Sequence, residues 1–411
     1  MGRLRRGTSL WLDQYDGPTL EAPPLRGRHE ADVVIVGGGI TGCLTAERLA
    51  RGGLRVSLLE SKRIGRGSTS ASTALLMQEP DVDFGDLAER YGRRTTATVW
   101  AASRRAVGAM SRALARLGHR KAVHRLPSVY FTRDAGEART LEREVRARLR
   151  AGIKCRWLNA DQLRKLSGID GAGAILTQGN AQVNPYRACL AFAAAAARHG
   201  AALHEHSAVR RIRVEGSGVE AVTGRGVVRA RWAVIATGYA TPEFKPLAGR
   251  FTMKETYVLA TAPLGASGRR RLGLGDVMLW DTDRPYHYAR WTADGRLLFG
   301  GCDHPHTRKT SAASLRVRIR DLLDDLHDLY PAAADLSPDY AWGGLFATTP
   351  DGLPYIGPHR RYPRHLFALG YGGNGMTFGF LAGEILERSL SGRARPEDEL
   401  FRFNRAEQLD G

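Results

Sequence analysis

Apolar positions along the chain fall into short runs that alternate with longer amphipathic stretches, a pattern typical of strands alternating with helices. The clearest unit begins with the apolar, β-branched run 32–36, which suits a strand buried on both faces. A helix is predicted from about Thr41 to Arg51, and a second strand follows at 55–60. Strand, helix and strand in this order predict a βαβ unit.

The rest of the pattern continues this alternation. Helices are predicted at 87–117, 137–150, 185–199 and 312–329, the third with Asn184 as its cap and Pro185 at its first position. Strands are predicted at 129–131, 176–183, 204–214, 218–223, 227–230, 232–238, 286–291 and 296–299, the last two joined by the hairpin turn Asp294-Gly295. The fold class expected is α/β combined with α+β.

Glycines mark the turn of the βαβ unit. Gly37, Gly39 and Gly42 have the G-x-G-x-x-G spacing, in which the glycines permit a tight turn, a close approach of a pyrophosphate and close packing of helix on strand. Glu60 ends the second strand, where a carboxylate can accept hydrogen bonds from ribose hydroxyls. A glycine-rich turn before an ordinary helix is the alternative, but the register of all four parts favours a site for FAD or NAD.

Two further stretches have chemistry suited to a nucleotide. The run 64–74 consists largely of small and hydroxylated residues, which can offer backbone N–H groups to phosphate or a flat ring, although a flexible linker has a similar composition. Residues 366–377 repeat the order strand, glycine-rich turn, helix. A second helix N-terminus aimed at the cofactor suits a flavin, because its pyrimidine end gains negative charge on reduction.

Composition narrows the classes of protein. A length of 411 residues suits two domains, and 43% hydrophobic residues suffice for a packed core. The net charge of +19 comes from arginines spread over the whole chain, which favours solvated surfaces over a nucleic-acid site; capture of anionic partners is the minority reading. The four scattered cysteines predict reduced thiols and no metal site. With no apolar run of 18 residues and no signal-peptide core, we expect a cytoplasmic protein without a transmembrane segment.

Taken together, these motifs resemble the FAD-dependent D-amino-acid oxidase superfamily, which includes sarcosine and glycine oxidases, amino-acid dehydrogenases and amine oxidases of the γ-glutamylputrescine type. The resemblance is carried by 37–42 with Glu60, 67–70, 236–238, 349–357 and 370–376. It implies a Rossmann-like FAD-binding domain (1–90, 170–245 and 340–411) interleaved with a mixed-sheet substrate domain (91–169 and 246–339). The FAD-binding residues that it implies, together with the glycine motif, are Gly37, Gly39, Ile40, Thr41, Gly42, Glu60, Ser61, Gly67, Ser68, Thr69, Ser70, Val209, Thr237, Gly238, Gly373, Asn374, Gly375, Met376 and Thr377.

The resemblance also implies a reaction: hydride passes from a carbon bearing an amine to flavin N5, and the resulting imine hydrolyses. Tyr286, Tyr288 and Arg290 share one face of a predicted strand, which is either a substrate wall or the solvated side of a sheet. Several related amino-acid oxidases carry an arginine just before the T-P-D-G-L-P motif, to clamp the substrate carboxylate, whereas this chain has Phe346 in that region. Either Arg290 replaces that arginine, or the substrate is an amine without a carboxylate and Phe346 forms an apolar wall.

Other readings stay open from the sequence. The electron acceptor is oxygen or an electron carrier, and Cys302 is a poorly aligned candidate for covalent attachment of the flavin. From another class of function come a tRNA-modifying or RNA-associated flavoprotein of the same fold and a flavoprotein subunit that has lost turnover.

Overall fold

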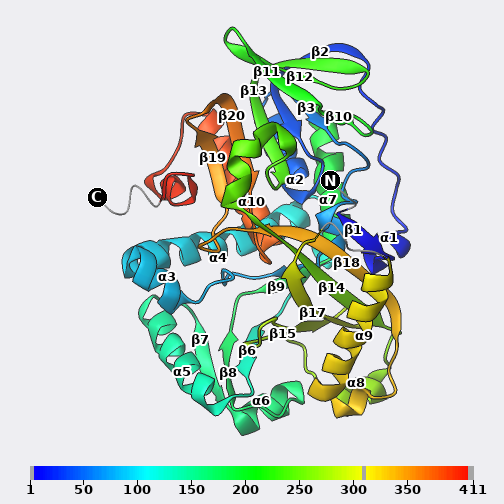
Figure 1. The fold of residues 1–411 in the computed structure, drawn as a ribbon, viewed down its shortest axis with the longest axis vertical. Coiled ribbons are helices and arrows are strands. Elements are labelled where there is room, and N and C mark those ends of the chain that lie inside the picture. Colours follow the sequence, from blue (N-terminus) through cyan, green and yellow to red (C-terminus); the bar gives the residue numbers. More distant parts are fainter. Residues whose placement is uncertain (1–3, 308–311, 406–411) are drawn as a thin grey trace.

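The computed structural model describes residues 4–307 and 312–405. Two large sheets lie one above the other in the view of Figure 1, with helices packed between and around them. Across these described ranges, no helix combines the length and the apolar character needed to cross a bilayer.

The upper sheet has eight strands and contains the βαβ unit. Its strands are β2 (Gly27–Val36), β3 (Val56–Leu59), β10 (Ala202–His204), β11 (Arg211–Glu215), β12 (Gly218–Val222), β13 (Gly226–Gly238), β19 (Tyr355–His359) and β20 (Tyr362–Leu369). The central strands β10, β3, β2, β13 and β20 are parallel, so their carboxyl ends meet at one edge of the sheet. In open sheets of this kind, ligands bind at that edge.

Four helices of 12 residues or more contribute to the apolar core on one face of this sheet, together with shorter segments. They are α2 (Ile40–Arg51), α4 (Arg93–Arg116), α7 (Pro185–Arg198) and α10 (Gly375–Leu390). The predicted cap of α7 is present, because the Asn184 side chain accepts a hydrogen bond from the Arg187 N–H at 3.0 Å. A smaller core on the other face includes Phe244 and Leu247 of the 3₁₀ segment η3 (Pro242–Arg250).

The lower sheet has nine strands of mixed direction. In spatial order these are β1 (Arg5–Gly7), β18 (Pro338–Thr348), β14 (Thr252–Thr261), β17 (Leu297–Pro305), β16 (Tyr288–Trp291), β15 (Met278–Asp281), β6 (Ser128–Thr132), β8 (Gly173–Thr177) and β7 (Cys155–Asn159). The helices in this half are α5 (Ala135–Arg150), α6 (Ala160–Ser167), α8 (Ala266–Leu272) and α9 (Ala312–Leu329). The predicted Asp294-Gly295 hairpin joins β16 to β17.

The remaining elements are short. They are α1 (Leu10–Asp13), α3 (Phe84–Tyr91), a small sheet of β4 (Leu75–Leu76), β9 (Ala181–Val183) and β5 (Val123–Arg125), and the 3₁₀ turns η1 (Ser68–Ala71), η2 (Arg120–Ala122), η4 (Pro331–Ala333) and η5 (Pro396–Phe401).

Several predicted elements differ from the structure. The single helix predicted at 87–117 is two helices, α3 and α4, because Gly92 between them has a φ of +78° that breaks the helical path. The strand predicted at 176–183 divides into β8 and β9, which belong to different sheets. Conversely, 227–230 and 232–238 form the one long strand β13, since its two halves pair with different neighbours on one side, β12 and then β20.

Sheet membership does not follow the predicted domain ranges everywhere. Strands β1 and β8 and most of β18 fall in ranges predicted for the FAD-binding domain, yet all three belong to the nine-stranded sheet. The domain boundaries themselves stay a prediction.

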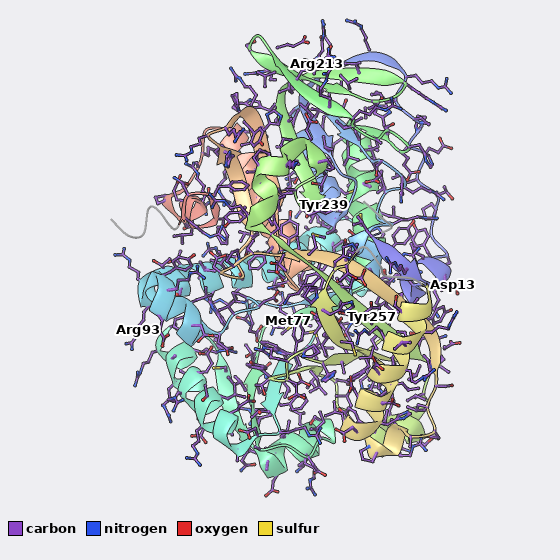
Figure 2. The ribbon with its side chains drawn as sticks, in the orientation of Figure 1. Asp13, Met77, Arg93, Arg213, Tyr239 and Tyr257 are labelled. Carbon is purple, nitrogen blue, oxygen red and sulfur yellow. The ribbon has the colours of Figure 1, made fainter. Side chains whose placement is uncertain are left out.

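Basic side chains project from distant parts of the surface. Arg213 in β11 and Arg93 at the start of α4 are both exposed, the first at the top of the molecule and the second at its left edge in Figure 2. This placement matches the even spread of arginine along the sequence.

Candidate functional site

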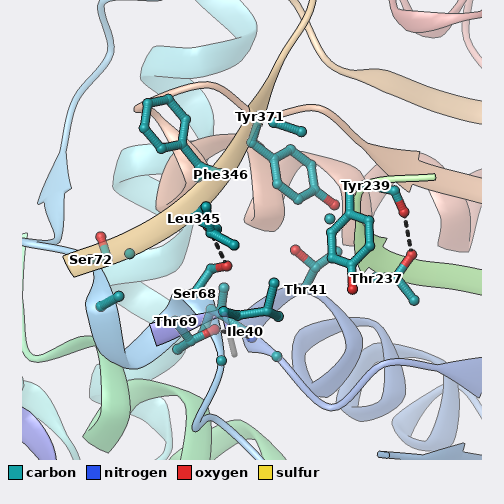
Figure 3. A pocket seen from close by; sticks show the side chains of 18 of the residues that line it. Ile40, Thr41, Ser68, Thr69, Ser72, Thr237, Tyr239, Leu345, Phe346 and Tyr371 are labelled. Carbon is teal, nitrogen blue, oxygen red and sulfur yellow. Dashed lines mark hydrogen bonds between the residues drawn. The ribbon is translucent and has the colours of Figure 1, made fainter. Parts of the chain in front are cut away.

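A cavity of about 490 Å³ opens where the carboxyl ends of the parallel strands face the lower sheet. Its lining comes from both sheets: from the turn before α2, the end of β3, η1, the end of β13 and the turn before α10 on one side, and from β14, β15, β16 and β18 on the other. Figure 3 shows Ile40 and Thr41 of α2 on the same cavity as Leu345 and Phe346 of β18. A cavity of this size and position is typical of a ligand site.

The turn into α2 brings backbone close to backbone. A side-chain carbon on Gly37 would lie 2.6 Å from the Ala236 carbonyl oxygen, and Gly37 also has a φ of +111°. One on Gly42 would lie 1.8 Å from the Gly37 carbonyl oxygen, so the third glycine permits helix and strand to pack. Gly42 does not line the cavity, whereas Gly37, Gly39, Ile40 and Thr41 do.

Glu60 follows β3 and binds the same turn. One carboxylate oxygen accepts a hydrogen bond from the Gly38 N–H at 2.8 Å, and the other accepts from the Lys62 N–H at 2.8 Å and the Ser61 hydroxyl at 3.0 Å. A carboxylate offers about four acceptor positions, so one position is left for a hydroxyl donor in the cavity. Glu60 and Ser61 both line the cavity.

The small-residue run forms η1 and links the two sheets. The Ser68 hydroxyl donates to the Leu345 carbonyl of β18 at 2.7 Å, and the Thr69 hydroxyl accepts from the Ile40 N–H at 3.0 Å (Figure 3). Gly67, Ser68 and Thr69 line the cavity. Ser70 does not, because it is fully buried and its hydroxyl donates to the Gly67 carbonyl at 3.1 Å.

The second glycine-rich turn places the N-terminus of α10 at the cavity. The Asn374 amide donates to the carbonyls of Met77 and Glu79, at 3.1 and 2.9 Å, while its own side-chain oxygen is buried without a hydrogen-bond partner among the described residues. Gly373, Gly375 and Met376 also line the cavity, and so do Val209, Thr237 and Gly238 from the opposite side. Thr377 does not, since it is buried with its hydroxyl donating to the Met77 carbonyl at 2.7 Å.

Aromatic and hydroxyl side chains form the wall nearest the lower sheet. Tyr286 and Tyr288 have ring centroids 5.8 Å apart, and the Tyr288 hydroxyl lies 2.8 Å from that of Thr256 in β14. Tyr288 covers Gly300, where a side-chain carbon would lie 2.1 Å from its ring. Burial raises the pKa of both tyrosines, so their hydroxyls stay protonated at neutral pH.

Asp81 places a carboxylate at this wall. It is exposed to the cavity, and it accepts a hydrogen bond from the Gly373 N–H. Because protein surrounds the cavity, burial raises the pKa of Asp81 to about 6, against the opposing effects of the Gly373 N–H and the Lys254 charge. The wall therefore has an anionic group next to two neutral hydroxyls at neutral pH.

Arg290 does not belong to this wall, which corrects one alternative from the sequence. Its guanidinium donates to the carbonyls of Thr73, Trp291 and Val183, at 2.8, 3.3 and 3.2 Å, and lies 5.2 Å from the centre of the Trp11 ring. Arg290 lies two residues after Tyr288 in β16. Its side chain does not line the cavity and packs instead beneath the N-terminal segment. Burial lowers its pKa, and it is only 3% exposed.

Cys302 is also placed away from the cavity. Its thiol lies 3.5 Å from the Asp325 carboxylate of α9, on the far side of the sheet, so the structure contradicts its candidacy for covalent attachment of a flavin. Two of the other cysteines are close together, although all four are scattered in the sequence. The buried thiols of Cys43 and Cys189 lie 3.7 Å apart beneath the Gly38 carbonyl. All four cysteines are free thiols.

The motif at 349–354 has a structural role, in which it holds the C-terminal segment. Both oxygens of Asp351 accept from the Arg405 guanidinium, each at 2.6 Å, and one also accepts from the Tyr91 hydroxyl at 2.6 Å. Arg405 donates further to the carbonyls of Leu353 and Pro354. The motif therefore anchors the C-terminal segment and does not line the cavity.

Sequence reasoning missed Asp81, Trp280 and Asp303. Asp81 and Trp280 line the cavity, and Asp303 lies beside it with both carboxylate oxygens buried. The adjacent glycines Gly300 and Gly301 before Asp303 are the one feature of the sequence that could have indicated an irregular strand there.

Sequence reasoning also missed a cluster of possible metal ligands, Asp281, Asp283 and His287. Both His287 ring nitrogens are already paired with carboxylates, those of Asp281 and Asp325.

A family model described as FAD dependent oxidoreductase matches residues 32–388. The chain belongs to this family. It is 26% identical over 393 residues to glycine oxidase of Bacillus licheniformis, covering 93% of this chain and 99% of the relative. It is 28% identical over 372 residues to gamma-glutamylputrescine oxidoreductase of Escherichia coli K12, covering 89% of this chain and 85% of the relative. The crystal structure of glycine oxidase from Geobacillus kaustophilus shares the fold, with a TM-score of 0.77 at 23% identity over 90% of this chain and 96% of that one.

Membership of the FAD-dependent oxidoreductase family confirms the predicted fold class and cofactor. The protein is an enzyme that uses FAD to oxidise the C–N bond of an amine or amino acid. The cavity fits that cofactor on its own geometry. Side chains on Gly37 or Gly38 would fill the turn, two helix N-termini face the cavity, and the unpartnered Asn374 oxygen offers a buried acceptor.

Proposed function

We propose that FAD lies along the whole cavity, from the end of β3 to the turn before α10. Glu60 and Ser61 would hold the ribose, and Val209 would lie against the adenine. The N–H groups at the start of α2, with Gly67–Thr69 and Thr237–Gly238, would hold the pyrophosphate, while 373–376 would border the pyrimidine edge of the flavin. The support is that these groups line one continuous cavity. Gly42, Ser70 and Thr377 would act from behind it, by packing and by holding the loops.

The substrate that we propose is an amine without an obligatory carboxylate. One observation carries this proposal: among the described residues that line the cavity, the one basic residue is Arg63, whose guanidinium lies 3.3 Å from the Glu205 carboxylate at the ribose end. The wall of Tyr286, Tyr288 and Phe346 has no guanidinium, and Asp81 adds a negative charge there. A carboxylate would be repelled at this wall, whereas an ammonium group would be attracted.

Each wall residue would then have a distinct part. Phe346 would pack against the carbon chain of the substrate, Asp81 would attract its ammonium group, and the tyrosine hydroxyls would orient the amine by hydrogen bonds. FAD, when bound, supplies the acceptor for the hydride, and the imine produced hydrolyses in water. The protein contributes orientation and a largely water-free site.

The electron acceptor and the cellular location are further parts of this proposal. The electron acceptor is oxygen or an electron carrier, and release of peroxide during turnover would identify oxygen. Four free thiols support a cytoplasmic location. The family match and the relatives described above give no support to an RNA-associated protein or to a subunit without turnover.

A matched pair of compounds tests the substrate class. Pentylamine and norleucine differ by the α-carboxylate, so each is mixed anaerobically with the enzyme and the loss of flavin absorbance is followed. We expect rapid bleaching by pentylamine and slow bleaching by norleucine. The variant Phe346→Arg should reverse this preference, because its guanidinium would attract the α-carboxylate that norleucine has and pentylamine lacks. Faster reduction of the unmodified enzyme by norleucine would overturn the proposal.

A further inference from the structure

Asp303 is placed next to the cavity by a β-bulge in β17. Between the register pairs Glu255–His304 and Tyr257–Gly301, the single residue Thr256 of β14 stands opposite two residues, Cys302 and Asp303. Cys302 has a φ of +55° and its thiol faces α9. Bulges of this kind redirect a side chain and are common beside active sites.

The carboxylate of Asp303 is buried beside the Thr256 hydroxyl, and among the described residues it makes no hydrogen bond of ordinary geometry. Both of its oxygens are inaccessible to solvent. An unsatisfied buried carboxylate is costly to a fold, and an explanation by function is warranted. Burial raises the pKa of Asp303 to about 7, and the Thr256 hydroxyl and the Lys254 charge only partly oppose this rise.

Charged and titratable groups surround Asp303 from several elements. Lys254 comes from β14, Asp81 from the segment before α3, and Tyr286, His287 and Tyr288 from β16 and the turn before it. Lys254 and His287 favour the carboxylate, while Asp81 disfavours it. Together these groups leave the pKa of Asp303 at about 7, so at neutral pH its charged and neutral forms are present in similar amounts.

Two hydroxyls separate this acid from the cavity. Tyr288 lines the cavity, and its hydroxyl lies 2.8 Å from the Thr256 hydroxyl, which also lines it. Thr256 is in turn the register neighbour of Asp303, and its present acceptor, the Gly301 carbonyl, lies at the long distance of 3.5 Å. A rotation of the threonine side chain could therefore direct its proton to Asp303.

The proposed substrate creates a need for a proton acceptor. A simple alkylamine has a pKa close to that of lysine, about 10.4, and is an ammonium ion at neutral pH. Hydride loss from its carbon requires the nitrogen lone pair, so one proton must leave first. A cavity filled by cofactor and substrate has little water to take that proton.

We propose that Asp303 accepts, through the hydroxyls of Thr256 and Tyr288, the proton that the substrate ammonium releases before its C–N bond is oxidised. An N–H bond of the substrate breaks as an O–H bond forms on Tyr288, whose own proton moves to Thr256. The Thr256 proton moves to Asp303, which becomes a neutral carboxylic acid. No electrons are transferred, and the charges of ammonium and carboxylate cancel. This inference rests on the proposed amine substrate.

The pH profile of flavin reduction by pentylamine tests the relay. In the unmodified enzyme the rate should rise with an apparent pKa near 7, because Asp303 must be deprotonated to accept a proton. In Asp303→Asn and Thr256→Val the rise should move toward the pKa of the amine, about 10. Reduction at pH 7.5 should therefore fall about 100-fold or more and recover near pH 10.

Two control variants separate the relay from general damage. Thr256→Ser keeps the hydroxyl and should keep the rise near pH 7. Asp335→Asn removes an exposed acid that pairs with Arg271 at 2.8 Å and is not among the groups around Asp303, so it should leave the profile in place. Infrared titration of the resting enzyme gives a readout without turnover, since a carboxyl band that titrates near pH 7 should vanish in Asp303→Asn.

The outcomes are distinct. If pentylamine does not bleach the unmodified enzyme, the proposed substrate is wrong. If it does, but both Asp303→Asn and Thr256→Val keep the original profile, the relay alone is wrong. Should Asp303→Asn fail to hold FAD, Thr256→Val decides, and the absence of a carboxyl that titrates near pH 7 in the unmodified enzyme would overturn the relay as well.

Discussion

The replacement Gly42→Ala tests how the glycine turn supports FAD binding. The added methyl carbon would lie 1.8 Å from the Gly37 carbonyl oxygen and 3.0 Å from the Gly37 carbonyl carbon. An ordinary contact between carbon and oxygen needs about 3.3 Å, so helix α2 and the turn must move apart by about 1.5 Å. Both partners are backbone, and no side-chain rotation can relieve the overlap.

We expect this displacement to weaken FAD binding more than it weakens the fold. Overpacking typically costs about 1–3 kcal/mol, and the displaced N–H groups are those that face the cavity. A loss of about 1.4–2.8 kcal/mol in binding would raise the Kd for FAD about 10- to 100-fold. Titrating the apoprotein with FAD, followed by quenching of flavin fluorescence, measures this change directly.

Gly249→Ala is the matched control. No atom lies within 4 Å of the position that its methyl carbon would take, and its backbone is outside the left-handed region. This variant should bind FAD as the unmodified protein does. The reasoning would be refuted if Gly42→Ala kept the unmodified Kd, because the turn would then accept a shift of more than 1 Å without consequence for the cofactor.

Two further replacements test residues outside the cavity. Arg290→Leu should lower the free energy of unfolding by about 3 kcal/mol in urea denaturation, since three backbone carbonyls lose their donor; a changed ratio of KM between acidic and neutral amines would contradict this structural role. Asp351→Asn should destabilise by about 3–5 kcal/mol because Arg405 becomes a buried unpaired charge. Burial raises the pKa of Asp351, but hydrogen bonds from Arg405 outweigh this and lower it overall. Its contribution is therefore complete above the ordinary pKa and lost as pH falls below about 4, a loss that thermal melts should show in the unmodified protein and not in Asp351→Asn.

Several residues of the turn into α2 could be placed at the cavity from the sequence because the requirements of that turn are local. Glycine spacing, a terminal acid and a helix start all lie within 37–60, and backbone geometry dictates these residue types. Thr377 and Ser70 show the limit of that reasoning. They neighbour true lining residues in the sequence, but the turns direct their side chains into the protein.

The substrate end depends on contacts between distant segments, which the sequence does not encode in short motifs. Alternation offers a cavity wall as one of two alternatives for Tyr288, which does line the cavity, but it does not predict that Arg290 passes under the N-terminal segment to reach Val183 and Thr73. Asp303 reaches its place through a bulge, and one extra residue in a strand reverses every alternation argument after it. Asp81 lies in an irregular segment, where no periodicity guides a prediction.

The alternation of the chain between its two sheets affects how this enzyme could be altered. Successive segments join the upper sheet, the lower sheet and the upper sheet again, so neither half corresponds to a continuous stretch of sequence. A continuous segment transferred from a relative would carry strands of both sheets. It would therefore disturb the glycine-rich turns that line the cavity together with the wall of Tyr286, Tyr288 and Phe346. New specificity is therefore better sought by point changes at the residues of β14, β16 and β18 that line the cavity, because neighbouring strands hold their backbones in register.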